Sequence, residues 1–319
     1  MPGRNHTVVT YFILLGFSSL SEMQVLLFVL VLTSFTITLM GNILIMLITT
    51  LDRSLHTPMY FFLRNLSFLE ICYTSVTIPK MLANLLAEKK SISFTGCATQ
   101  LYFYLFFATA ECYLLAAMAY DRYMAISHPL RYTAVMSNRV CVLLVAGSYV
   151  AGIPVSFGQT TLIFSLPFCG PKEIHHFFCD IPPLLRLACT DTYSNEVEIF
   201  VVAVLVVMAP FLLILVSYAH IMVTILKMSS AEGRRKAFST CSSHLVVVTM
   251  FFGSGSFIYF RPKASYGGDS DRVSALLYIV LTPTLNPIIY SLRNEEVKGA
   301  LRRTLGRRCS NIQDCSLVA

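Results

Sequence analysis

The sequence predicts an all-α membrane protein, built as a bundle of seven transmembrane helices. Three observations predict this fold. Of the 319 residues, 55% are hydrophobic and only 13% are charged, the mean hydropathy is +0.67, and apolar runs recur at the length of a membrane-spanning helix. A soluble protein carries about 25% charged residues, and a disordered chain combines low hydrophobicity with high net charge. Both of these classes are therefore excluded.

The predicted helices follow one another with short polar connections. A helix needs roughly 20 apolar residues to cross hydrocarbon that is about 30 Å thick. Seven segments meet this requirement, at residues 25–50, 58–86, 97–126, 139–162, 197–226, 237–260 and 273–292. They divide the chain into an N-terminal tail (1–24), a seven-helix domain (25–292) and a C-terminal part (293–319).

The basic residues predict which side of the membrane each end occupies. Seven spans place the termini on opposite sides, and Lys and Arg favour the cytoplasmic side. Most of the 24 Lys and Arg residues, including Arg234-Arg235-Lys236, fall inside if the N-terminus is outside. The glycosylation acceptor Asn5 agrees with this orientation. Because the basic residues are divided between the two membrane ends, the net charge of +7 does not indicate binding to nucleic acid.

Apolar side chains recur at helical spacing after the seventh span, and basic side chains occupy the opposite face. This pattern is typical of a short amphipathic helix that lies along the inner membrane surface. The apolar stripe is Val297, Ala300, Leu301, Thr304 and Leu305, and the basic face is Lys298, Arg302 and Arg303. We therefore expect a cytoplasmic helix within residues 293–319.

Four of the ten cysteines fall on the predicted outer side, where disulfide bonds persist. Cys169, Cys179 and Cys189 lie in the longest loop, at about residues 163–196, and Cys97 begins the third span. Four cysteines permit three pairings, and the residues alone do not choose among them. A loop of this length is more than a connector, so we expect it to be functional.

Two acidic residues, Glu70 and Glu111, lie inside predicted spans. An ionisable group there costs at least about 2.5–3.5 kcal/mol and commonly marks function. One interpretation is that both acids face the bundle interior and share a Na⁺ ion or a proton with Asn42 and Asn286, because hard cations prefer oxygen ligands. The other is a protonated carboxyl group that only links helices. We predict no other cofactor.

Several motifs, taken in order, resemble the rhodopsin-like G-protein-coupled receptors. They are Gly41-Asn42 in span one, Asp121-Arg122-Tyr123 at the end of span three, Pro210 with Tyr218 in span five, and Asn286-Pro287-Ile288-Ile289-Tyr290 in span seven. Longer motifs are similar to the olfactory receptor subfamily: PMYFFL at 58–63, MAYDRY at 118–123, KAFSTCSSHL at 236–245 and PTLNP at 283–287. The resemblance covers essentially the whole chain.

The resemblance implies two disulfide bonds and a cation site. Cys97 would pair with Cys179, and Cys169 with Cys189. Glu70 and Glu111 would lie where the family places its sodium pocket. This chain departs from the family there, since the family usually has Asp at the position of Glu70, and the extra methylene group changes the geometry around a cation.

The resemblance also implies partners on both sides of the membrane. A heterotrimeric stimulatory G protein would bind the cytoplasmic face and raise cyclic AMP, and the receptor would work in the plasma membrane, in the cilia of olfactory sensory neurons. The cytoplasmic switch would consist of Asp121, Arg122, Tyr218, His244 and Tyr290. Whether His244 is neutral or charged stays open.

The ligand implied by the resemblance is a small, mostly apolar odorant, bound among spans three, five and six beneath the long loop. Small-molecule pockets are generally apolar with a few polar groups, and the matching positions have this composition. They contain no acid, so a cationic amine is not the expected ligand. The positions are Tyr104, Leu105, Ala108, Thr109, Val202, Val206, Ser256 and Tyr259.

Three other functions fit the sequence less well. A transporter would show an internal repeat with paired broken helices, and the chain has no such repeat. An enzyme would need a catalytic set, and neither a H-E-x-x-H motif nor a G-x-G-D motif occurs. The alternative within the same class is a rhodopsin-like receptor for a non-olfactory ligand.

Overall fold

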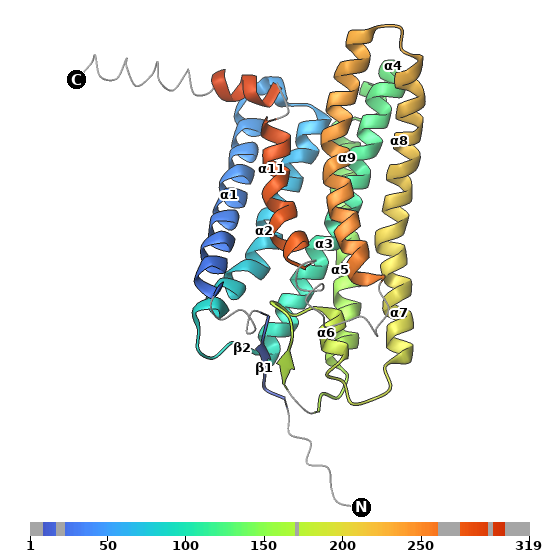
Figure 1. The fold of residues 1–319 in the computed structure, drawn as a ribbon. Coiled ribbons are helices and arrows are strands. Elements are labelled where there is room, and N and C mark those ends of the chain that lie inside the picture. Colours follow the sequence, from blue (N-terminus) through green and yellow to red (C-terminus); the bar gives the residue numbers. More distant parts are fainter. Residues whose placement is uncertain (1–8, 17–22, 170–171, 261–274, 293–295, 304–319) are drawn as a thin grey trace, which may run out of the picture.

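Long helices packed side by side make up most of the computed structural model, which describes residues 9–16, 23–169, 172–260, 275–292 and 296–303 (Figure 1). The first four are α1 (Gln24–Leu51), α2 (Pro58–Leu86), α3 (Phe94–Ser127) and α5 (Asn138–Phe164). A continuous helical rod follows, formed by α7 (Tyr193–Ala203), the π-helical turn η3 (Val204–Met208) and α8 (Ala209–Lys227). The bundle is completed by α9 (Ala231–Tyr259), the π-helical turn η5 (Leu277–Leu281) and α11 (Thr282–Leu292).

These helices coincide with the seven predicted segments to within a few residues at most ends. The largest difference is at α9, which begins at Ala231 rather than at residue 237. Ser230 explains the earlier start, because its hydroxyl accepts a hydrogen bond from Gly233 N at 3.2 Å and so caps the helix. Ser93 and Ser137 cap α3 and α5 in the same way, and Pro58 occupies the first turn of α2, where no backbone donor is needed.

Pro210 lies directly after a π-helical turn rather than at a sharp kink. Proline has no backbone N–H and its ring collides with the preceding turn. The wider turn Val204–Met208 absorbs this irregularity, so α7 and α8 continue as one rod. A second π-helical turn, η5, precedes α11, which contains Pro287.

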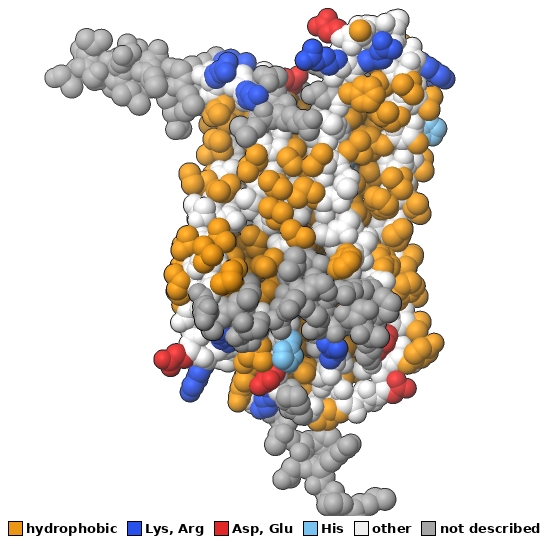
Figure 2. All heavy atoms as spheres, in the orientation of Figure 1, with side chains coloured by type: hydrophobic (Ala, Val, Ile, Leu, Met, Phe, Trp, Pro, Cys, Tyr) orange, Lys and Arg blue, Asp and Glu red, His pale blue; other side chains and the backbone are white. Residues whose placement is uncertain are grey.

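Four of the described helices are long and apolar enough to cross a membrane: α1, α3, α5 and the Tyr193–Lys227 rod. Shorter apolar stretches occupy Cys241–Phe257 and Leu277–Tyr290. In the most apolar part of the rod the mean hydropathy is 3.3, yet only 11% of its residues are buried inside the protein. Figure 2 shows apolar side chains over the middle of the visible face and charged ones toward its two ends. So much exposed apolar surface requires apolar surroundings, which fits a multi-pass membrane protein.

Glycines let two helix pairs approach closely. A Cβ atom at Gly41 of α1 would lie 2.7 Å from the Pro287 side chain of α11, and one at Gly152 of α5 would lie 2.8 Å from the Phe106 carbonyl oxygen of α3. Small residues at such crossings allow the tight packing that joins helices in membranes. The Gly41 contact also brings α1 against α11, which positions a polar cluster described below.

A small sheet at one end of the bundle departs from the all-α prediction. Its strands are β1 (Tyr11–Leu14), β2 (Ser91–Ser93) and β3 (Glu173–Ile174), in the order β2-β1-β3. β1 pairs antiparallel with β2 and parallel with β3. Three short helices were also not predicted: η2 (Arg53–Leu55), α4 (Pro129–Val135) and α6 (Ile181–Leu185). The sheet and α6 lie at the opposite end of the bundle from α4 and helix 296–303 (Figure 1).

Candidate functional site: an apolar cavity, a polar core and a cluster around Arg122

An apolar cavity of about 70 Å³ lies among α3, α5, the α7–η3 segment, α9 and η5, with α6 contributing Ile181. Most of its walls are aliphatic or aromatic side chains, and the polar groups among them are few, as in small-molecule sites generally. The lining residues are Leu105, Ala108, Thr109, Cys112, Val155, Gln159, Ile181, Ile199, Val202, Ala203, Val206, Val207, Phe251, Phe252, Gly255 and Tyr278.

Five of the eight expected ligand positions line this cavity: Leu105, Ala108, Thr109, Val202 and Val206. Tyr104 and Ser256 are not among its lining residues, and the Tyr259 side chain lies outside the described part of the structure.

Tyr104 is fully buried among other aromatic rings. Its ring centroid lies 5.6 Å from that of Tyr73 and 4.9 Å from that of Phe178. Phe178 belongs to the long outer loop, so Tyr104 supports that loop rather than facing the cavity.

Sequence reasoning missed the contribution of the fourth helix in the bundle. Val155 and Gln159 of α5 both line the cavity. Gln159 is only 3% exposed, and a polar side chain within an apolar run was the signal that could have identified it.

Two disulfide bonds fix the long loop over this end of the bundle. Cys97 is bonded to Cys179 and Cys169 to Cys189, with Cα–Cα distances of 5.5 Å and 5.7 Å. These are the two pairs that the family resemblance implied. The first bond ties the loop to the beginning of α3, close to β2.

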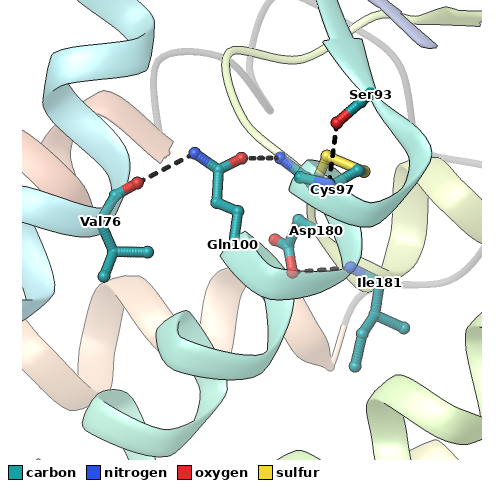
Figure 3. The surroundings of a disulfide bond; sticks show 8 residues. Val76, Ser93, Cys97, Gln100, Asp180 and Ile181 are labelled. Atoms are coloured by element: carbon teal, nitrogen blue, oxygen red, sulfur yellow. Dashed lines mark hydrogen bonds between the residues drawn. A yellow bond between two sulfur atoms is a disulfide. The ribbon is translucent and has the colours of Figure 1, made fainter. Parts of the chain in front are cut away.

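Gln100 reinforces this connection, as Figure 3 shows. Its Nε2 donates to the Val76 carbonyl oxygen at 3.0 Å, and its Oε1 accepts from Cys179 N at 2.9 Å. One side chain of α3 therefore joins α2 to the loop. Two residues after Cys179, Ile181 begins α6 and lines the cavity, so the loop forms part of the cavity wall.

A buried polar cluster lies deeper in the bundle, where α1, α2 and α11 meet. Glu70 Oε2 accepts from Asn42 Nδ2 at 3.1 Å, and Glu70 Oε1 accepts a short hydrogen bond from Asn286 Nδ2. All three side chains are 1% exposed. Glu111 of α3 is 3% exposed, and its carboxyl group interacts electrostatically with that of Glu70.

The donor set of this cluster suits a hard cation. Asn286 Oδ1 is buried and has no hydrogen-bond partner among the described residues, and the two carboxyl groups supply further oxygens. Sodium prefers such oxygen ligands. In contrast, no group of three or more His, Cys, Asp or Glu residues that could hold a metal ion occurs in the described ranges.

A second cluster lies at the other end of α3. The Tyr218 hydroxyl and His244 Nδ1 share a hydrogen bond of 2.7 Å. Tyr290, from α11, is 6% exposed, and its hydroxyl has no hydrogen-bond partner among the described residues. Arg122 is half-buried and interacts electrostatically with these three side chains. The structure therefore brings together four of the five expected switch residues.

Asp121 is hydrogen-bonded to the short helix α4. Its Oδ1 accepts a hydrogen bond of 2.8 Å from the Tyr132 hydroxyl, which belongs to α4. Burial, and then the neighbouring Asp121 carboxylate, raise the pKa of the Tyr132 phenol, so that the phenol stays protonated and donates. Tyr132 was not identified from the sequence, because nothing marked residues 129–135 as a helix packed beside α3.

Helix 296–303 is attached to the first connection of the bundle. Arg303 donates to Asp52 Oδ2 from Nε at 3.1 Å and from Nη2 at 2.9 Å, and the Tyr60 hydroxyl donates to Glu296 at 2.8 Å. Hydrogen bonds from Ser54, and then from Arg303, lower the pKa of Asp52 to about 2.

The faces of this helix follow the predicted pattern in part, since Lys298 and Leu301, from opposite predicted faces, are both half-buried. Val297 and Ala300 are buried, whereas Arg302 and Arg303 are exposed. Thr304 and Leu305 lie outside the described residues, as does the glycosylation acceptor Asn5.

These features define a helical, multi-pass membrane protein with an apolar cavity toward one end and the Arg122 cluster toward the other. The family model described as "Olfactory receptor" matches residues 30–308. Human olfactory receptor 10A7 is 54% identical over 95% of this chain and 96% of its own length. Human olfactory receptor 10A2 is 57% identical over 92% of this chain and 97% of its own length. The chain belongs to the olfactory receptor family, a class of G-protein-coupled receptors for small odorants.

Proposed function

We propose that this protein binds small, mostly apolar volatile molecules in the cavity among α3, the α7–α8 rod and α9, and that binding activates a stimulatory G protein. This proposal rests on the cavity. It is lined almost entirely by apolar side chains, includes five of the expected ligand positions, and is bordered by a loop that two disulfide bonds hold in place. No acidic residue is among its lining residues, so a neutral ligand suits it better than an amine.

In the proposed orientation seven helices span the bilayer of the plasma membrane, with the N-terminus outside. Both disulfide bonds then lie on the extracellular side, where oxidising conditions preserve them. Arg122, Arg234 and Arg303 lie at the other end, and basic residues favour the cytoplasmic side. The same proposal places the receptor in the cilia of olfactory sensory neurons, and this location rests on family membership.

Ligand binding would shift the bundle between two conformations, by no more than the difference in the ligand's affinity for them. Arg122, Tyr218, His244 and Tyr290 come from α3, α8, α9 and α11, so any outward movement of α9 must rearrange their contacts. The stimulatory G protein would bind the face that this movement opens, and cyclic AMP would rise.

Filling the cavity tests the proposed ligand site. Cells that express the olfactory-type stimulatory G protein are screened with an odorant panel, and cyclic AMP is recorded. We expect the Ala108→Leu receptor to lose at least about tenfold in potency for any active odorant, because overpacking a cavity wall disfavours occupation. The matched control is Ala219→Leu, since Ala219 is exposed on α8. Equal potency of the Ala108 variant and the wild type, at equal surface expression, would contradict the cavity assignment.

We further propose that Glu70 and Glu111, with the Asn286 amide oxygen, hold a Na⁺ ion. The ion would supply positive charge between two buried acids. At a Na⁺ concentration about ten times the dissociation constant, binding would stabilise the receptor by about 1.4 kcal/mol. Exchanging Na⁺ for N-methylglucamine should therefore lower the melting temperature of the purified receptor by a few degrees.

The Glu70→Gln variant provides the comparison for the sodium experiment. It keeps the size of the side chain and one accepting oxygen but lacks the charge. We expect its melting temperature not to respond to the exchange. If the variant and the wild type respond equally, the acids bind no sodium.

A further inference from the structure

Gln159 is a polar side chain of the cavity wall that is hydrogen-bonded to a neighbouring helix. It lies on α5, is 3% exposed and lines the cavity. Its Nε2 donates to both carboxylate oxygens of Glu198 on α7, at 2.9 Å and 3.0 Å. The amide therefore connects two helices, and the Gln159 side chain is part of the cavity wall.

Glu198 determines the orientation of the Gln159 amide group. An ionised carboxylate can only accept hydrogen bonds, and only the nitrogen of a glutamine amide can donate them. In this arrangement both Glu198 carboxylate oxygens accept from the Gln159 nitrogen. Rotating the Gln159 amide by half a turn would place oxygen against two carboxylate oxygens, which is repulsive. The nitrogen is thus committed to Glu198.

The other end of the amide is consequently a pure acceptor. Gln159 Oε1 is buried and has no hydrogen-bond partner among the described residues, and a buried acceptor without a partner is unfavourable. The polar neighbours Thr109 and Tyr278 carry hydroxyl groups, which can both donate and accept. They accommodate a ligand oxygen of either kind, whereas Gln159 accommodates only a ligand that donates.

We propose that Gln159 makes this cavity selective for apolar ligands that carry a hydroxyl group, in preference to ketones and aldehydes of the same skeleton. The inference rests on the cavity being the ligand site, as proposed above. An alcohol or phenol donates to Gln159 Oε1, and so replaces any hydrogen bond that water would make there. A carbonyl compound of the same shape leaves the oxygen unpaired, and sites of this kind reject such analogues strongly.

The test measures binding separately from signalling. The purified full-length receptor is heated with matched pairs: cyclohexanol and cyclohexanone, menthol and menthone, benzyl alcohol and benzaldehyde. We expect half-maximal stabilisation at a concentration at least about tenfold lower for the alcohol of an active pair. The same pairs are then applied to cells in the cyclic AMP assay.

Two variants assign the preference to Gln159. Gln159→Leu removes the acceptor, and we expect the alcohol and the carbonyl compound to bind it equally well. In Glu198→Gln, the new amide can donate as well as accept, so Gln159 is free to reverse and present its NH₂ group. This variant should gain affinity for the carbonyl compounds by about tenfold, although residue 198 is exposed and outside the cavity lining.

The outcomes separate this inference from the proposed function. Equal stabilisation of the wild type by both members of every pair, or by neither, would overturn the selectivity. An unchanged preference in the Gln159→Leu variant would also overturn it. Alcohol-selective stabilisation without a cyclic AMP response would support the role of Gln159 and contradict the proposed coupling to a stimulatory G protein.

Discussion

The Arg122→Ala receptor will reach the cell surface and give no ligand-dependent rise in cyclic AMP. Arg122 is half-buried and interacts with Tyr218, His244 and Tyr290, which come from three other helices. In the proposed mechanism its guanidinium group moves away from these side chains and meets the G protein once α9 moves. Alanine offers neither the charge nor the five donors of arginine, so we expect a loss of signal rather than a shift in potency.

The measurement combines a cyclic AMP reporter with surface labelling of the same cells. Arg139→Ala is the matched control, because Arg139 is exposed at the beginning of α5 on the same side of the molecule. We expect it to signal normally. Arg122→Lys should retain only part of the response, since lysine keeps the charge and lacks the planar fork. A normal response from Arg122→Ala at normal surface levels would refute the proposed role.

The Cys97→Ser receptor will fail to reach the cell surface. The Cys97–Cys179 bond closes a segment of 82 residues, and the chain-entropy model assigns such a cross-link about 4–5 kcal/mol. That amount is comparable to the whole folding free energy of many domains. Without the bond the outer loop would no longer be held against α3, and Ile181 would lose its place in the cavity wall.

Surface labelling of Cys97→Ser and Cys179→Ser cells measures this effect. The two variants should be equally impaired, and the double variant no worse than either, because all three lack the same bond. Cys72→Ser provides the control, since Cys72 is a free thiol of α2. Surface display and ligand response at wild-type levels in Cys97→Ser would show that the bond is not needed.

The helical framework could be predicted from sequence because each helix is specified locally. Apolar length identified the long helices, and Pro58, Ser93 and Ser137 explain where α2, α3 and α5 begin. The family resemblance implied the two disulfide pairs and named the residues of the cluster around Arg122. The three-stranded sheet was missed because its strands have only two to four residues each and pair across more than 70 positions of the chain.

The polar contacts of the site were less accessible to sequence reasoning. The pairing of Gln159 with Glu198, and of Asp121 with Tyr132, depends on how two helices face each other. Helical spacing places Leu105 and Thr109 on one face of α3, and both line the cavity. The same spacing did not reveal that Tyr104 packs against Phe178 of the outer loop.

The buried cluster around Glu70 has a consequence for how the protein is made. Glu70 lies on α2, early in the chain, and one of its partners, Asn286, follows 216 residues later on α11. Until α11 has been synthesised, Glu70 can accept the hydrogen bond from Asn42 but not the one from Asn286. A carboxyl group in hydrocarbon costs at least about 2.5–3.5 kcal/mol, so a prematurely terminated chain keeps an incompletely paired acid within the bilayer. In the proposed seven-span topology, the seventh helix therefore supplies the second hydrogen bond to the acid on the second helix.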